Sequence, residues 1–133
     1  MRYLGDVDVL SNLRNGRAVE QLLPGRVEDA SSIVRYISLE RAGVDRWAVR
    51  LCEVLDIGNT DFIDVYVFPA LDPDEPFGAV ALFPTPEAAL THARVALSAD
   101  PRKFVNVGMV QSEYQDACRT GPDGGPLDRG PNR

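Results

Sequence analysis

The acidic run Asp72-Pro73-Asp74-Glu75 is the densest group of potential ligand atoms in this chain of 133 residues. Carboxylate oxygens are the ligands that hard cations such as calcium and magnesium prefer. The order of residues departs from that of a calcium-binding loop, because Pro76 stands where a third oxygen ligand would be and Phe77 where the turn glycine belongs. We therefore expect no metal site, and no cofactor.

The chain has few groups suited to acid–base or nucleophilic catalysis. Its one histidine, His92, falls beside Ala88 and Val95 on a predicted helix, off the main apolar stripe, which is typical of a surface or boundary residue rather than a base. The sequence has no Gly-x-Ser-x-Gly elbow, no glycine-rich loop ending in Gly-Lys-Ser or Gly-Lys-Thr, and no His-Glu-x-x-His. Cys52 and Cys118 lack Cys-x-x-Cys spacing and are expected to be buried, reduced thiols. No catalytic residue is predicted.

Negative charge is concentrated in the middle of the chain. The formal net charge is −6, which disfavours binding to nucleic acid or to an anionic membrane surface. Between residues 51 and 93 there is no Lys or Arg, but there are eight acids: Glu53, Asp56, Asp61, Asp64, Asp72, Asp74, Glu75 and Glu87. Surface acids commonly serve solubility alone. If this region binds a partner, the partner should be basic.

Aromatic residues accompany one of these acids between residues 62 and 68. In an extended segment the even-numbered side chains share one face, and the aliphatic residues Ile63, Val65 and Val67 share the other. Aromatic residues at this spacing commonly belong to a core. On an uncovered face they would form a patch rimmed by acids, similar in composition to the centre of a protein interface. The predicted partner-binding surface comprises Phe62, Asp64, Tyr66, Phe68, Asp72, Asp74 and Glu75.

The elements that must position these side chains are predicted from periodicity and turn residues. Alternation of apolar residues predicts five strands, over residues 31–40, 46–56, 62–68, 77–83 and 104–110. The turn residues Gly58 and Asn59 predict that the second and third of these form an antiparallel hairpin. Helical spacing predicts helices over 6–23, interrupted at Asn15-Gly16, over 86–97 with Thr85 as N-cap, and over 112–118 with Ser112 as its cap.

These elements predict an α+β fold, a single largely antiparallel sheet of about five strands with helices packed on one face. The opposite face would lack a cover. We divide the chain into an N-terminal helical segment, 1–26, which could be an extension, an α+β domain, 27–119, and a disordered tail, 120–133, rich in Gly and Pro. No apolar run is long enough to span a membrane and no secretory signal is evident, so a cytoplasmic location is expected. Thirteen arginines against one lysine are typical of a GC-rich, bacterial genome.

Two functions from different classes remain open. The first is a small, acidic, non-enzymatic protein-binding domain, of immunity or adaptor type, that docks a basic protein partner. The second is a small-molecule-binding or enzymatic domain with a pocket between the sheet and the 86–97 helix, lined by Tyr36, Tyr66 and Asn106. The oligomeric state is not determined by the sequence.

Overall fold

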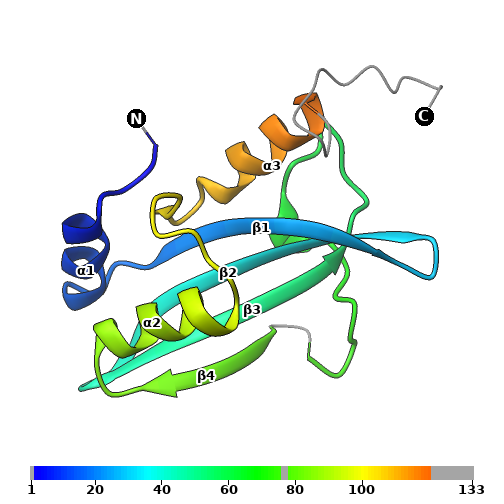
Figure 1. The fold of residues 1–133 in the computed structure, drawn as a ribbon. Helices are drawn as coiled ribbons and strands as arrows, with labels where there is room; N and C mark the ends of the chain where they lie inside the picture. Colours follow the sequence, from blue (N-terminus) through cyan, green and yellow to red (C-terminus); the bar gives the residue numbers. More distant parts are fainter. Residues whose placement is uncertain (1, 76–77, 121–133) are drawn as a thin grey trace.

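The computed structural model describes residues 2–75 and 78–120, and it confirms the predicted α+β fold class. Five strands form one antiparallel sheet in the order β4-β3-β2-β1-β5 (Figure 1). The strands are β1 (Val19–Glu28), β2 (Ser31–Gly43), β3 (Arg46–Leu55), β4 (Ala79–Phe83) and β5 (Val105–Asn106). Contacting the sheet are the helices α1 (Asp6–Arg14), α2 (Pro86–Ala96) and α3 (Val110–Thr120), and a 3-10 helix, η1 (Val65–Val67), lies between β3 and β4 in the chain.

The sheet carries a separate hydrophobic core on each face. Because side chains alternate along a strand, Ile37, Leu39 and Val49 point to one side and Val34, Tyr36 and Val54 to the other. The first set packs with α1 and α2, on what we call the α2 face, in a core that includes Leu13, Ala89, Ala93 and Phe104. The second packs with η1 and α3, on the α3 face, in a core of Val34, Tyr36, Val54, Val65, Phe68, Val110 and Tyr114. The prediction of helices on one face therefore holds for α1 and α2, whereas α3 lies on the opposite face (Figure 1).

The first strand replaces part of a predicted helix. Residues 19–23 match helical spacing, but Val19, Gln21 and Leu23 are buried on the α2 face, as alternation in a strand requires. Pro24-Gly25 does not end this element, because a register shift between Leu23 and Arg26 absorbs the pair and β1 continues to Glu28. The predicted interruption at Asn15-Gly16 is confirmed, since α1 ends at Arg14. β1 thus spans the predicted boundary between residues 26 and 27.

Several other predicted elements are confirmed, with changed bounds. The strands over 31–40 and 46–56 form the β2–β3 hairpin, and the strand over 77–83 is β4, which begins at Ala79. The predicted helix over 86–97 is α2, and the Thr85 hydroxyl accepts the N-cap hydrogen bond from the Ala88 amide at 3.0 Å. The predicted tail from residue 121 lies outside the described residues.

Two predicted strands are wrong or mostly wrong. The strand over 62–68 is absent: β3 pairs with β4 instead, and the segment forms a loop with η1 at its centre. The strand over 104–110 is reduced to the two residues of β5, because the chain turns at Gly108, where φ is +93°, and enters α3 at Val110. α3 therefore begins two residues before Ser112, which lies inside the helix and is not its cap.

Candidate functional site

The chain turns sharply after β3 because short polar side chains bond to the local backbone. The Asp56 carboxylate accepts a hydrogen bond from the Gly58 amide at 3.2 Å, and the Asn59 side-chain oxygen accepts from the amides of Asp61 and Phe62 at 2.8 and 3.1 Å. Such bonds compete with strand pairing, which is why no hairpin forms here. Gly58 is also sterically required, since a Cβ at this position would lie 2.4 Å from a ring atom of Phe68.

α3 holds this loop against the sheet. The Gln111 side chain donates to the Asp64 carboxylate at 3.1 Å, the Gln115 side chain donates to the Thr60 carbonyl oxygen at 2.9 Å, and the Tyr114 hydroxyl donates to Asp56. The phenolic pKa of Tyr114 is raised, first by burial and then by its hydrogen bond to Asp56. The conformation of residues 56–64 therefore depends on α3.

The aromatic residues of the predicted surface have different environments. Phe68 is only 4% exposed, and its ring meets those of Phe62 and Tyr114 edge-on, with centroids 5.3 and 5.5 Å apart. Phe62 and Tyr66 are 38% and 43% exposed. Phe62 and Tyr66 are thus accessible to a partner, whereas Phe68 belongs to the core on the α3 face.

A buried carboxylate anchors Tyr66. Glu20 of β1 is 4% exposed and accepts hydrogen bonds from the Tyr66 hydroxyl at 2.6 Å and from the Gly108 amide at 3.0 Å. Burial raises the pKa of Glu20, and the two hydrogen bonds oppose that shift only in part. The pKa of Tyr66 is raised too, mainly by burial and then by its bond to Glu20. This arrangement ties β1, η1 and the β5–α3 turn together at one point.

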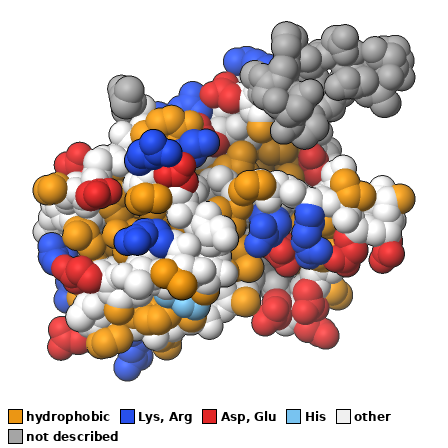
Figure 2. Space-filling view, in the orientation of Figure 1, with side chains coloured by type: hydrophobic (Ala, Val, Ile, Leu, Met, Phe, Trp, Pro, Cys, Tyr) orange, Lys and Arg blue, Asp and Glu red, His pale blue; other side chains and the backbone are white. Residues whose placement is uncertain are grey.

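The acidic loop before β4 lies elsewhere. The Asp72 carboxylate accepts from the Asp74 amide at 2.9 Å, and the Asp72 carbonyl oxygen accepts from the Glu75 amide at 3.0 Å. Asp72, Asp74 and Glu75 are exposed. Figure 2 shows acidic side chains gathered over this loop. A shallow hollow beside it is lined by Leu51, Glu53, Leu71, Asp72, Glu75, Gly78 and Ala79.

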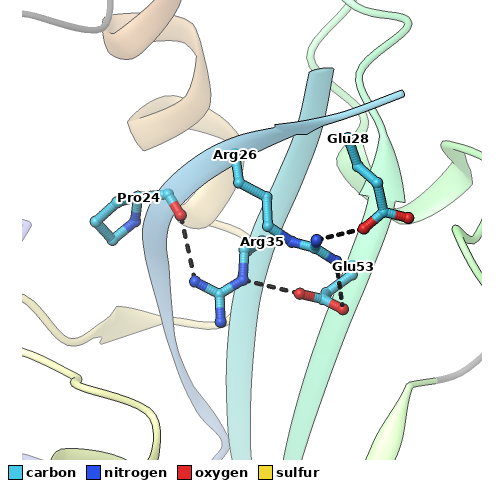
Figure 3. Close-up of polar contacts among 5 residues, drawn as sticks. All are labelled: Pro24, Arg26, Glu28, Arg35 and Glu53. Carbon is cyan, nitrogen blue, oxygen red and sulfur yellow. Dashed lines mark hydrogen bonds and ion pairs between the residues drawn. The ribbon is translucent and has the colours of Figure 1, made fainter. Parts of the chain in front are cut away.

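The carboxylate of Glu53 at this hollow is already neutralised. Arg35 of β2 donates to Glu53 at 2.9 Å, and Arg26 of β1 lies 3.3 Å from the same carboxylate while also pairing with Glu28 at 2.5 Å (Figure 3). The Arg35 side chain also reaches the Pro24 carbonyl oxygen at 3.5 Å. Strand pairing brings these side chains together, because Glu53 is the register partner of Arg35, and Arg26 is the register partner of Ile33, which lies two residues before Arg35 on the same face. The network balances charge across three strands.

The other acids of the central stretch lack this balance. Of the eight acids between residues 51 and 93, Glu53 and Glu87 have ion pairs, the latter with Arg14. Within residues 2–75 and 78–120, no Lys or Arg forms an ion pair with the remaining six: Asp56, Asp61, Asp64, Asp72, Asp74 and Glu75. The negative field of this region is therefore largely uncompensated.

The structure divides the seven predicted site residues into two groups. Phe62, Asp64, Tyr66 and Phe68 lie on the α3 face or in its core. Asp72 and Glu75 line the hollow with Leu51 and Glu53, whose side chains point to the α2 face, and Asp74 lies between them in the chain. Sequence reasoning did not include Ile57 and Val67, which are 51% and 60% exposed beside the aromatic residues in the chain. The turn residues around Ile57 could have indicated its exposure.

The alternative pocket does not have its predicted lining. α2 covers the α2 face, whereas Tyr36 and Tyr66 lie on the α3 face with their ring centroids 6.0 Å apart. Asn106 accepts a hydrogen bond from the Asn12 side chain at 2.9 Å, near α1. The prediction that these three residues line one pocket beneath α2 is therefore wrong.

Within the described residues, no group of three or more His, Cys, Asp or Glu side chains is placed to hold a metal ion. His92 stacks on the Phe83 ring, with centroids 4.9 Å apart. Cys52 and Cys118 are half-buried thiols that are not joined in a disulfide, and burial raises the pKa of the Cys52 thiol.

Comparisons with known proteins add no relative: no family model, no curated protein and no solved structure matches this chain. None of the described helices combines the length and the apolar character that a membrane span needs.

Proposed function

We propose that the protein is a non-enzymatic binding domain, of immunity or adaptor type, whose partner is a basic protein. The observation that carries this proposal is the concentration of exposed, unpaired acids in a stretch, residues 51–93, that contains no Lys or Arg. Within the described residues, the exposed acids Asp61, Asp72, Asp74 and Glu75 have no ion pair. Exposed acids elsewhere that also have no ion pair, such as Asp29 and Asp45, have an arginine within three residues in the chain. Unpaired surface charge of one sign steers a partner of opposite charge and selects against wrong partners.

Exposed apolar side chains supply the second component of such a surface. Ile57, Phe62, Tyr66 and Val67 are all more than a third exposed and lie near acids in the chain. Aromatic side chains in this position commonly anchor a partner, and the surrounding acids contribute mainly to the rate of association and to specificity. Tyr66 is held in place by Glu20, so its ring is preorganised for contact. We place this activity in the bacterial cytoplasm, a setting in which cysteines that form no disulfide would remain reduced.

The test is affinity capture from native lysate with a variant that neutralises the unpaired acids, Asp61→Asn, Asp72→Asn, Asp74→Asn and Glu75→Gln. These replacements keep the side-chain oxygens that cap the local backbone while changing the formal net charge from −6 to −2. We expect one stoichiometric basic protein to be captured by the natural chain at low salt, to be released as salt rises, and to be lost with this variant.

A matched control neutralises four exposed acids elsewhere, Asp6, Asp8, Asp29 and Asp45, each to Asn. It has the same net charge of −2, and Asn tolerates the positive φ of Asp29 and Asp45. We expect this control to keep the partner. Equal loss with both variants would show that only the overall charge matters. Unchanged capture with the first variant would refute the proposed surface.

A further inference from the structure

β4 is an open, uncharged edge of the sheet. Its one strand neighbour is β3, and among the described residues its backbone makes no hydrogen bond to any other segment. Val80 and Leu82 are 48% and 56% exposed on the α3 face. Natural sheets usually protect an edge with charge, proline or a covering segment. The opposite edge has such a cover, because β5 is only two residues long and Tyr3 bridges Val105.

The helix layer above this edge is uncharged too. Ala88, His92 and Ala96 are spaced by four residues along α2 and therefore share one flank of the helix. The stacking of His92 on Phe83 shows that this flank lies over β4. The charged Glu87 lies on the other side of the helix, where it pairs with Arg14 of α1. Both layers at this edge thus lack the like charges that would repel a second acidic chain.

We propose that this edge pairs with the same edge of a second copy, so that β4 and its symmetry mate form one continuous antiparallel sheet. A two-fold axis at Ala81 would place Ala81 opposite its own copy and Val80 opposite Leu82 of the partner subunit. The four exposed aliphatic side chains would then cover one another on the α3 face, and the uncharged flanks of α2 would meet on the α2 face. Pro84 ends the paired stretch on each side, because it has no amide to donate.

Charge complementarity at the ends of the strand favours a copy in this antiparallel direction. The end at which β4 begins adjoins the acidic loop, since Asp72 and Glu75 line the hollow with Ala79. The end at which β4 finishes adjoins the start of β3, where Trp47 is the register partner of Phe83 and of Arg41, and where the exposed Arg41 and Arg46 outnumber Asp45. Antiparallel pairing brings the acidic end of one strand towards the basic end of the other. Parallel pairing would bring like ends together.

Sedimentation equilibrium of the full chain tests the proposal. We expect the mass-average mass to rise towards twice the monomer mass as the concentration increases from micromolar to hundreds of micromolar. The variant Val80→Lys with Leu82→Lys should remain monomeric at every concentration. A control with two lysines at exposed valines away from β4, Val27→Lys with Val107→Lys, should dimerise like the natural chain. A natural chain that stays monomeric throughout would overturn the proposal, and so would a dimer that the lysines on β4 do not weaken.

A cross-link provides a second readout that does not depend on how well the lysine variant folds. Directly opposed residues of antiparallel strands have Cα atoms about 4.5–5.5 Å apart, within the range that a disulfide spans. Ala81→Cys should therefore form a disulfide-linked dimer under mild oxidation. Val107→Cys, placed away from the edge, should not. Cross-linking of Ala81→Cys that is no faster than that of the control would contradict the proposed two-fold axis.

Discussion

Replacement of Phe68 by Ala tests whether this residue belongs to the core of the α3 face or to its surface. Phe68 is 4% exposed and packs edge-on against Phe62 and Tyr114. Removing a fully buried phenylalanine ring costs about 3–5 kcal/mol of unfolding free energy, because apolar contacts are lost and a cavity remains. Since α3 and the Gly58 backbone enclose the ring, the site has little room to collapse. We therefore expect a loss of about 4 kcal/mol.

Phe62 is the matched comparison, because its ring packs edge-on against the Phe68 ring but is 38% exposed. Phe62→Ala should cost about 1–2 kcal/mol, in proportion to the smaller area that it buries. In urea unfolding, a loss of 4 kcal/mol moves the midpoint by about 2 M at a slope typical of a chain of this size, with the slope unchanged. The double variant should reveal a coupling of about 0.5–1.5 kcal/mol between the two rings.

An equal loss for Phe68→Ala and Phe62→Ala would refute the assignment of Phe68 to the core. Should Phe68→Ala not fold, Phe68→Leu keeps most of the volume and should still cost about 1–2 kcal/mol. The comparison bears on function as well. Phe62→Ala should weaken partner binding in a protein that remains folded, whereas Phe68 variants should reduce capture only as far as they reduce the folded population.

Three further outcomes follow from individual contacts. The pKa of Glu20 is raised in the folded state, so as pH rises through 4.5 Glu20 ionises first in the unfolded chain, and the folded state loses stability. Urea unfolding should therefore show that Glu20→Gln gains stability relative to the natural chain from acidic to neutral pH. A difference in unfolding free energy that stays constant with pH would contradict this. Thr85→Ala should cost about 1 kcal/mol of unfolding free energy by removing the α2 N-cap, while Thr85→Ser should cost much less. Gly58→Ala should cost about 2 kcal/mol or more through its clash with Phe68, whereas Gly43→Ala, which meets open space, should be nearly neutral; equal effects would argue against the crowding at Gly58.

The sequence predicted those elements that local signals determine. α2 has a capping threonine, a proline in its first turn and one apolar stripe, and the β2–β3 hairpin has clear alternation on both arms. β1 was missed because Val19, Leu22 and Leu23 fit both a helical and a strand period, and only pairing with β2 decides between them. Such pairing is a tertiary effect that periodicity does not contain.

The exposure of several predicted site residues agrees with the sequence, but their arrangement does not. The rings of Phe62 and Tyr66 and the acids Asp72, Asp74 and Glu75 are exposed, but the aromatic residues lie on the α3 face, apart from the acidic loop. The burial of Phe68 could not be predicted, because it depends on α3 crossing to the face that was expected to be open. The buried hydrogen bonds of Glu20 could not be predicted from the sequence either, since the residues that donate to it are 46 and 88 residues away in the chain.

The placement of α3 on its own face has a consequence for how the chain is made. The core on the α2 face is complete once Phe104 has been added, but the core on the α3 face still lacks Val110 and Tyr114 at that point. In a chain that is cleaved or released before residue 110, only η1 would remain to cover Val34, Tyr36 and Val54, and we expect part of this apolar surface to face solvent. Such surfaces associate readily. Packing of α3 on the sheet therefore protects the complete chain from such association. We expect protein quality control to act on products that end before α3.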